Sequence, residues 1–406
     1  MLTKFNLEDF IAQHVTGRSE SLLTRDLANN HDLLEERIDG KSALVIGGAG
    51  TIGSSFIRAL LHFRPRRLYV VDTNENGLTE LVRELRSAGI YHIPTEFITY
   101  PINLGDPVFA KLIRQEGPFE IVANFAAHKH VRSEKDAYSI EAMIDNNVLK
   151  AKRLLDLLSE NPPERFFCVS TDKAANPVNI MGASKKLMEE VILAYTARFR
   201  VATARFANVA FSNGSLPLGF LDRTMRQQPW SCPRGIRRFF VSPQESGQIC
   251  LMSCILGESG DIFFPKLDEN RDMIPFDQIA IALCEALGYK PHICKSEDEA
   301  RKVAAKLTPR SRKYPIYFFD SDTSGEKNFE EFYTDRETLD LDRFEMLGVI
   351  KDAKRANFEQ IDTLFADLKQ VFEKPRIEKA DIVHVLRHYL PNFEHIEKGK
   401  HLDQRM

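Results

Sequence analysis

Short apolar runs, rich in β-branched and aromatic residues, alternate with helical segments over much of this chain, and this alternation strongly constrains its fold. The runs span residues 43–48, 67–72, 96–103, 120–126, 165–171 and 200–206. Strands that are apolar along their whole length are buried on both faces, which is typical of a parallel sheet covered by helices on each side. The sequence therefore predicts a doubly wound α/β fold around a parallel sheet.

The alternation weakens after about residue 210, where turn residues become frequent, as in SNGSLPLG and QQPWSCPRG. We expect an amphipathic helical arm at residues 1–40, an α/β domain at 41–210 and a smaller mixed lobe at 211–375. A charged tail at 376–406 contains one helical pattern, KADIVHVLRHYL. The arm is expected to pack or to mediate oligomer contacts rather than to catalyse.

The composition fits a soluble globular protein, because 43% of the 406 residues are hydrophobic and 28% are charged. A net charge of −3 gives no general attraction to nucleic acid or anionic membranes. There is no apolar run of about 18 residues, and the N-terminus lacks a signal-peptide pattern, so we expect no membrane insertion. The six cysteines show no CxxC spacing, which indicates reduced, buried thiols in the cytoplasm and no metal site.

A glycine array follows the first predicted strand in the segment VIGGAGTIGSSF. Gly47, Gly50 and Gly53 permit a tight turn and a close backbone approach to a pyrophosphate, and the N-terminus of the next helix adds N–H donors. Thr51 and Ile52 lie within the same loop. The array is weak evidence alone, but its place between a strand and a helix predicts a Rossmann-type dinucleotide site.

Residues at the ends of the next three strands extend this cofactor site. Asp72 ends the second strand, where a carboxylate binds a ribose diol and repels a 2′-phosphate, so NAD is favoured over NADP. Alternatively, Asp72 only caps the next helix. Asn103, with Leu104 beside it, ends the third strand and is placed to hold the adenine edge. Ala126 and Ala127 end the fourth strand, on the expected nicotinamide side.

The segment CVSTDKAANPVNIMGASKK, residues 168–186, follows the pattern of a short-chain dehydrogenase with one departure. Those enzymes place Ser or Thr at a strand end and Tyr-x-x-x-Lys at the start of the next helix. Thr171 and Lys185 fall at the matching positions, but Met181 occupies the tyrosine position. The segment therefore raises the question of whether this site is inactive or performs a different reaction.

Together with GGAGTIG, NFAAHKHV, NNV, RFANV and SGEKNFEEFY, this segment resembles the nucleotide-sugar 4,6-dehydratases of bacterial polysaccharide synthesis. These are extended short-chain dehydrogenases acting on UDP-N-acetylglucosamine, and the similarity runs from about residue 40 to 335. Some members have tyrosine at the triad position, whereas the configuration-retaining members have methionine, as here. Many of the methionine members carry membrane helices, which are not expected in this chain. The resemblance also implies a homo-oligomer.

The resemblance implies a reaction in which the C4 hydroxyl is oxidised by NAD, water leaves across C5–C6, and the hydride returns to C6. Thr171 would hydrogen-bond the C4 oxygen, and Asp172 would protonate the departing C6 hydroxyl. Lys173 would remove the C5 proton, provided that burial or nearby cations lower its pKa. Lys185 would bind the nicotinamide ribose, and Asn147 would support the water network and the cofactor.

Because methionine cannot exchange a proton, the role of Met181 leaves two interpretations open. In one, the C4 hydroxyl proton leaves through Asp172 or a water molecule, and the thioether shapes the pocket. In the other, oxidation has been lost and the chain is a catalytically silent NAD-binding regulator. A 4-epimerase, which returns the hydride to C4, is the alternative among enzymes, but it has no use for the adjacent Asp172 and Lys173.

The lobe at residues 211–375 would mainly bind the nucleotide sugar, together with polar residues near the carboxyl edge of the sheet. The resemblance assigns the loop after the sixth strand to the diphosphate, and it assigns an arginine before two aromatic residues to the same group. A lone histidine such as His130 is often structural, and Arg237 is an equally charged alternative to Arg238. The expected substrate residues are Lys129, His130, Asn208, Ser215, Arg238 and Glu326.

Overall fold

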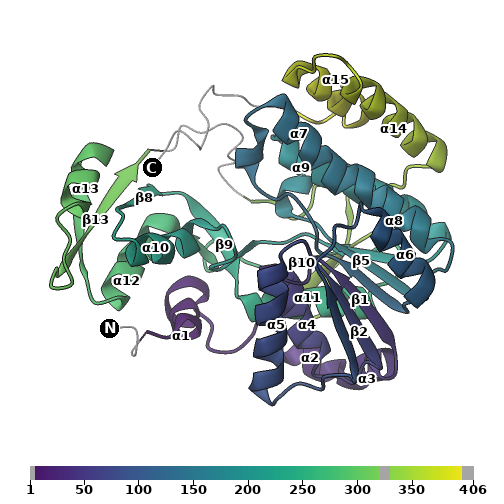
Figure 1. Ribbon diagram of the computed structural model, residues 1–406, viewed down its shortest axis with the longest axis horizontal. Coiled ribbons are helices and arrows are strands. Elements are labelled where there is room, and N and C mark those ends of the chain that lie inside the picture. The colour runs from purple at the N-terminus through teal and green to yellow at the C-terminus, as the bar shows by residue number, and fades with distance from the viewer. Residues whose placement is uncertain (1–4, 321–329, 396–406) are drawn as a thin grey trace.

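The computed structural model describes residues 5–320 and 330–395 and is built around a nine-stranded sheet (Figure 1). Its strand order is β14-β15-β10-β6-β5-β4-β1-β2-β3. All pairs from β3 to β10 are parallel, whereas β15 and β14 join antiparallel. The strands are β1 (Ser42–Ile46), β2 (Arg67–Val71), β3 (Glu96–Tyr100), β4 (Ile121–Asn124), β5 (Arg165–Val169), β6 (Arg200–Ala204), β10 (Ile262–Pro265), β14 (Thr338–Asp340) and β15 (Leu347–Lys351). The predicted parallel α/β sheet is confirmed.

Helices cover both faces of this sheet, as its buried strands require. One layer contains α3 (His31–Ile38), α4 (Thr51–Leu60), α5 (Glu75–Ala88) and α11 (Pro243–Leu256). The other contains α6 (Pro107–Glu116), α7 (Ala137–Ile144), α8 (Lys150–Leu158) and α9 (Ile180–Ala194). A hairpin of α14 (Phe358–Phe372) and α15 (Lys379–Tyr389) packs outside the second layer, and α15 coincides with the helix predicted for the tail.

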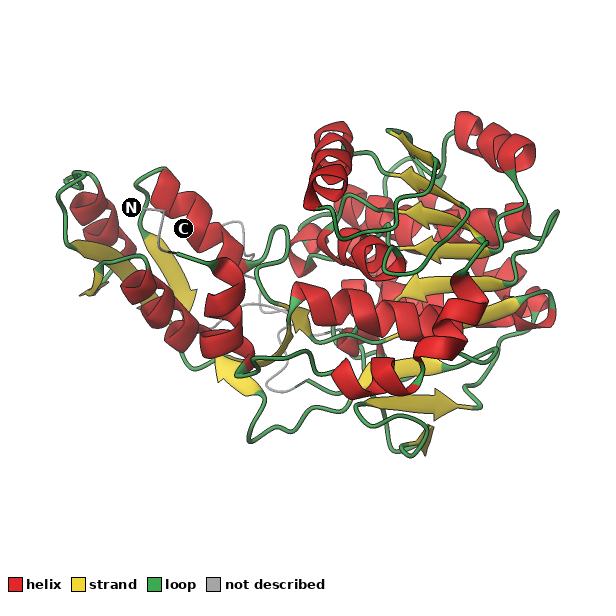
Figure 2. Ribbon diagram, turned by 90° about the horizontal axis from the view of Figure 1, so that it is seen from below, coloured by secondary structure: helices red, strands yellow, loops and turns green. Residues whose placement is uncertain are grey.

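A smaller lobe stands beside the large sheet (Figure 2). Its sheets are β11-β9-β7 and β12-β13-β8, and its core includes Phe220, Trp230, Phe240 and Tyr314. The strands are β7 (Asn208–Val209), β8 (Trp230–Pro233), β9 (Arg237–Val241), β11 (Met273–Pro275), β12 (Lys290–Cys294) and β13 (Lys313–Phe319). The helices are α10 (Leu216–Met225), α12 (Phe276–Ala286) and α13 (Glu297–Ala304).

The predicted boundary at residue 210 differs from the structure. Residues 211–375 do not form one lobe, because α11, β10, β14, β15 and α14 pack with the large sheet. The physical reason is that β10 extends the parallel sheet beside β6, and the buried strand β15 completes that edge by antiparallel pairing. The chain therefore crosses between the two cores more than once.

The N-terminal arm joins the same two cores. It contains α1 (Leu7–Ile11), a π-helical turn (Ala12–Thr16), α2 (Thr24–Asn29) and α3, one more α-helix than the two predicted. Phe10 of α1 is buried in the smaller core, and Leu34 of α3 is buried in the larger one. Between them, Arg18 binds both carboxylate oxygens of Glu245 at 2.8 Å. The arm thus packs along both lobes.

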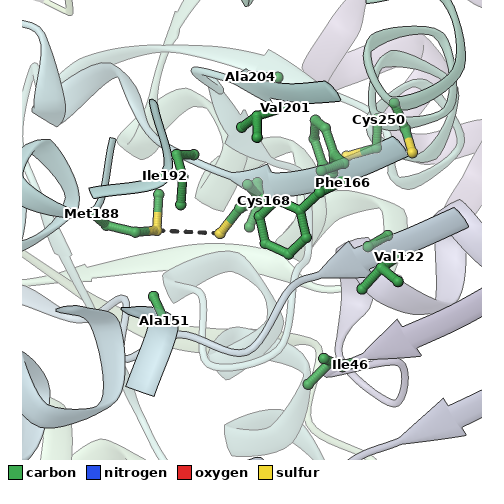
Figure 3. Close-up of a cluster of buried hydrophobic side chains, with 14 of the residues drawn as sticks. Ile46, Val122, Ala151, Phe166, Cys168, Met188, Ile192, Val201, Ala204 and Cys250 are labelled. Carbon is green, nitrogen blue, oxygen red and sulfur yellow. Dashed lines mark hydrogen bonds between the residues drawn. The ribbon is translucent and has the colours of Figure 1, made fainter. Parts of the chain in front are cut away.

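The cysteines lie in the apolar interior. All six are free and buried, which confirms the prediction of reduced, buried thiols. Figure 3 shows Cys168 of β5 beside Met188 of α9, with 3.3 Å between the two sulfur atoms. Burial raises the pKa of the Cys168 thiol and raises that of Cys254 to about 12, so both are protonated at neutral pH. Their contribution is to packing.

No helix within residues 5–320 and 330–395 is both long enough and apolar enough to span a lipid bilayer.

Candidate active site

The glycine loop closes tightly against the end of β4. Gly47 has a φ of +77°, and a Cβ atom added there would lie 2.6 Å from the backbone nitrogen of Ala126. A Cβ on Gly53 would collide with the carbonyl oxygen of Gly47. Gly50 precedes α4, and Thr51 accepts a hydrogen bond from the backbone N–H of residue 213 through its hydroxyl, at 2.9 Å. The loop therefore presents backbone atoms, rather than side chains, toward the start of α4.

Asp72 is bonded to this loop. Its carboxylate accepts hydrogen bonds from the N–H groups of Ala49 and Asn74, both at 2.9 Å. The cap of α5 is Asn74, whose side chain accepts from the N–H of Gly77, so the alternative that Asp72 caps this helix is wrong. Asn103 turns onto its own loop and accepts from the N–H of Gly105 at 2.8 Å. Leu104 packs partly buried against the large core.

A cleft of about 730 Å³ lies between the carboxyl edge of the large sheet and the smaller lobe. It is lined by residues from β5, α9, the loop after β4 and the smaller lobe, including Phe240 and Phe276. The predicted site residues that line it are Ile52, Ala127, Lys129, His130, Thr171, Asp172, Lys173, Met181, Lys185, Asn208 and Ser215. Fold and motif thus bring the predicted catalytic residues into one cleft.

Three consecutive residues form a polar cluster where β5 ends. Asp172 begins a 3₁₀ turn, Asp172–Ala174, and its side chain is buried. The hydroxyl of Thr171 donates to Oδ1 of Asp172 at 2.7 Å, and Nζ of Lys173 lies 3.0 Å and 3.2 Å from the two carboxylate oxygens. These contacts make an acid, an amine and a hydroxyl neighbours at one strand end.

The protonation of Lys173 differs from the sequence-based expectation. Burial lowers the pKa of its amine, but the charges of Asp172 and Glu330 outweigh that effect and raise the pKa above its usual 10.5. The expected lowering is therefore wrong, because the two carboxylates of Asp172 and Glu330 outweigh the effect of the nearby cation. Arg238 acts in the expected direction but more weakly.

Met181 and Lys185 lie one turn apart on α9. Asn179 caps the start of the helix, because its side chain accepts from the N–H of Gly182, and Glu134 accepts from the N–H of Met181 at 2.9 Å. Met181 is buried, and Lys185 donates to the carbonyl of Val169 at 2.6 Å. Burial lowers the pKa of Lys185. The thioether of Met181 occupies the tyrosine position, and this side chain has no titratable group.

Asn147, which was predicted to support the water network and the cofactor, is held by hydrogen bonds within the protein. Its amide accepts from the N–H of His128 at 2.8 Å and donates both to the carbonyl of His128 and to the hydroxyl of Ser184. These bonds use both ends of a buried side chain to fix the loop after β4 onto α9. The contact to Ser184 was missed, because only the fold brings residues 147 and 184 together.

Among the described substrate candidates, Lys129, His130, Asn208 and Ser215 line the cleft, whereas Arg238 does not. Lys129 and His130 are exposed side chains, although desolvation of the amine at the tip of Lys129 lowers its pKa. Ser215 caps α10 by accepting from the N–H of residue 218, and Asn208 donates to Glu330 at 2.7 Å. Arg238 is buried, whereas the alternative, Arg237, is exposed and donates to carbonyls of residues 269 and 273. Glu326 lies outside the described residues.

Glu330 is an ionisable group beside Lys173 that sequence reasoning missed. It is buried, and Oε1 lies 3.9 Å from Nζ of Lys173. Its other oxygen accepts from the N–H of Phe239 in β9 at 2.8 Å. The available signal was the last part of the SGEKNFEEFY motif, which has two further glutamates after Glu326.

Comparison with known proteins identifies relatives over 62% to 81% of the chain. The chain is 29% identical over 352 residues to an uncharacterised membrane protein of Methanocaldococcus jannaschii, covering 81% of this chain and 96% of that protein. It is 28% identical to the probable polysaccharide biosynthesis protein EpsC of Bacillus subtilis, covering 71% of this chain but only 46% of EpsC. It is 26% identical to a UDP-N-acetylglucosamine 4,6-dehydratase (inverting) of Campylobacter jejuni, covering 62% and 73%.

Solved structures show the same fold at lower identity. Pen from Bacillus thuringiensis superposes with a TM-score of 0.62 at 19% identity, covering 79% of this chain and 90% of Pen. DesIV, a dTDP-glucose 4,6-dehydratase from Streptomyces venezuelae solved with NAD, has a TM-score of 0.54 at 17% identity, covering 86% and 97%. The model of the polysaccharide biosynthesis protein family matches residues 43–352, most of the chain. The family resemblance of the sequence motifs is thereby confirmed, and the chain belongs to the polysaccharide biosynthesis protein family.

Proposed function

We propose that this protein is an NAD-dependent nucleotide-sugar 4,6-dehydratase acting on UDP-N-acetylglucosamine or a similar nucleotide-linked N-acetylhexosamine. The observation that carries the proposal is the contact of Asp172 and Lys173 at the end of β5, inside the cleft and beside Thr171. Relatives named UDP-N-acetylglucosamine 4,6-dehydratase support the substrate class, and a structural neighbour solved with NAD supports the cofactor.

The residues at the end of β1 fit a dinucleotide. Gly47 cannot carry a Cβ atom without contacting the backbone at Ala126, so the loop keeps the open backbone surface that a pyrophosphate needs. Gly50 leads into α4, whose first N–H groups would bind the phosphates, and Asp72 would bind the adenine ribose. When bound, NAD would supply reversible hydride transfer, in which a hydride is accepted from C4 of the sugar and later returned to C6.

The chain's own groups would move the protons. The ion pair between Lys173 and Asp172 corresponds to an ammonium group beside a carboxylate. Transfer of one proton between them yields a carboxylic acid and a neutral amine, with no change in the total proton count. The amine would then remove the C5 proton, and the acid would protonate the leaving C6 hydroxyl. The ammonium of Lys173 would return a proton to C5 when the hydride adds at C6. Thr171 would donate a hydrogen bond to the C4 oxygen.

Met181 takes no proton in this scheme. Because Asp172 already carries the proton from Lys173, the C4 hydroxyl proton would leave through a water molecule, while the buried thioether shapes the wall next to Lys185. Relatives named UDP-glucose 4-epimerase, at 27% identity, make epimerisation the second candidate. Epimerisation requires no acid and base at C5 and C6, so the Asp172–Lys173 contact favours dehydration.

The test is incubation of the purified protein and NAD with UDP-N-acetylglucosamine. The expected product is one water lighter, has a new C6 methyl signal in its proton NMR spectrum and accumulates without net NADH. Asp172→Asn and Lys173→Ala should each lower kcat by about 10²-fold or more, as loss of a general acid or base does. Unchanged substrate with several nucleotide-linked hexosamines would refute the proposal, and a C4 epimer as product would replace it by the second candidate.

A further inference from the structure

Glu330 is a buried carboxyl that the proposed reaction does not use, although it meets the catalytic lysine. Its Oε1 atom lies 3.9 Å from Nζ of Lys173, 3.7 Å from Nε of Arg238 and 2.7 Å from the amide nitrogen of Asn208. Its Oε2 atom accepts from the backbone N–H of Phe239 at 2.8 Å. The side chain is only 3% exposed, so water screens these contacts little.

The charged groups around Glu330 come from three separate segments. Asp172 and Lys173 lie after β5, Arg238 lies in β9, and Glu330 itself precedes β14. Burial and the charge of Asp172 raise the pKa of Glu330 from 4.5 to about 7, against the opposing effects of Lys173, Arg238 and the Phe239 N–H. Glu330 therefore changes its charge in the neutral range, where most other carboxyls stay ionised.

This charge change acts directly on Lys173. An ionised Glu330 is the second anion, after Asp172, that stabilises the ammonium form of the lysine. A protonated Glu330 removes that support, and the desolvation of the amine then favours loss of its proton. Since the proposed base must be a neutral amine, the ionised form of Glu330 opposes the reactive proton distribution and the protonated form favours it.

We propose that Glu330 is a positioning residue that, together with Asp172, holds the amine of Lys173 and sets its protonation state through its own charge. The inference rests on the proposed function for its catalytic meaning, because Lys173 is a base only in that reaction. The contacts to Lys173 and Arg238 do not depend on the function.

Replacing Glu330 by Gln tests the inference without removing the side chain. The Gln carbonyl can still accept from the N–H of Phe239, and its NH₂ group can donate to the Asn208 amide once that amide is flipped. Glu331→Gln is the matched control, because it removes one negative charge from the next residue, whose carboxylate accepts a hydrogen bond from Asn176. Circular dichroism would establish that both variants are folded.

The readout is the titration of Lys173 itself. Lysines are reductively methylated with a ¹³C label, the Lys173 signal is assigned with Lys173→Arg, and its shift is followed against pH by NMR. The side chain is 28% exposed and thus open to the reagent. In Glu330→Gln the midpoint should fall by about one pH unit or more, as expected for loss of a charge about 4 Å away. In Glu331→Gln it should remain as in the parent protein.

The parent protein gives a second measurement that needs no variant. Its Lys173 signal should show a smaller shift near pH 7, when Glu330 titrates, before the main change of the amine. An unchanged Lys173 midpoint in folded Glu330→Gln would overturn the inference. If that variant does not fold, a parent Lys173 signal that stays constant between pH 6 and 8 (roughly one unit either side of a pKa near 7) would overturn it equally.

Activity separates this inference from the proposed function. If no nucleotide sugar is dehydrated, the proposed function fails while the Lys173 titration still decides the inference. If dehydration occurs, the pH at which the rate rises with loss of the Lys173 proton should move to lower pH in Glu330→Gln. A uniform loss of rate at every pH, with an unmoved Lys173 midpoint, would mean a structural role alone and would refute the inference.

Discussion

A buried ion pair beneath the cleft permits a quantitative prediction. Arg205 at the end of β6 and Glu189 of α9 are both 0% exposed and are joined by two hydrogen bonds of 2.9 Å and 3.0 Å. Arg205 also binds Glu337 and the carbonyl of Phe332, while Ser170 donates to Glu189 at 2.6 Å. This network ties the end of β5 to the segment that carries Glu330, so we choose Glu189→Gln as the perturbation.

The structure gives the size of the effect. Burial acts to raise the pKa of Glu189, but Arg205, Lys186 and the hydrogen bonds from Arg205 and Ser170 lower it from 4.5 to about 2. A depressed carboxyl pKa stabilises the fold above the unfolded value, and at about 1.4 kcal/mol per pH unit this contribution is about 3 kcal/mol at neutral pH. The variant should therefore lose about 3 kcal/mol, at the lower end of the cost of breaking a buried ion pair.

Urea unfolding followed by circular dichroism measures this loss. The difference in unfolding free energy between parent and variant should be constant from pH 7 to about pH 5 and should shrink as the pH falls from about 4.5 toward 2. In this range Glu189 is already protonated in the unfolded chain but is protonated in the folded protein only near pH 2. Glu190→Gln, one residue further on α9 and half-buried, is the control and should change stability by less than about 1 kcal/mol. A loss below about 1 kcal/mol for Glu189→Gln would refute the reasoning.

Three further changes probe the site. Gly47→Ala should weaken NAD binding by more than about tenfold in a calorimetric titration, since the added Cβ meets the backbone at Ala126 and φ is +77°; Gly89→Ala, also at positive φ but in open space, should leave NAD binding unchanged. Met181→Leu should keep kcat within about tenfold, because the swap conserves volume; a larger loss would show that the thioether contributes chemistry. Asn147→Ala should cost about 1–3 kcal/mol in urea unfolding, because it leaves buried polar groups unpaired; a selective loss of NAD affinity without destabilisation would instead support cofactor contact.

The local features of the fold could be predicted from the sequence because each depends on neighbouring residues. Continuous apolar runs such as residues 43–48 indicate buried parallel strands, and Gly47 and Gly53 permit one kind of turn between a strand and a helix. Thr171 through Lys173 are adjacent in sequence, so their meeting at a strand end follows once β5 is placed. These predictions needed no knowledge of long-range packing.

The features that were missed depend on contacts between distant segments. Asn147 bonds to Ser184, and Glu330 bonds to Phe239, across 37 and 91 residues. Neither contact leaves a periodic pattern. The return of β15 to the large sheet was missed for the same reason, since LGVIK is short and contains a glycine. The expected cytoplasmic location and homo-oligomeric state stay predictions.

The missed contacts also explain why the chain crosses repeatedly between its two cores. The segment from Glu330 to Glu337 is bonded to β9 of the smaller lobe at one end and to Arg205 of the large sheet at the other. Glu330 therefore faces Lys173 only while both lobes hold this segment in place. A variant that loosens the Arg205 network, such as Glu189→Gln, should thus lower the Lys173 titration midpoint as well as the stability, although Glu189 does not touch that lysine. Loss of stability with an unmoved midpoint would mean that β9 alone positions Glu330.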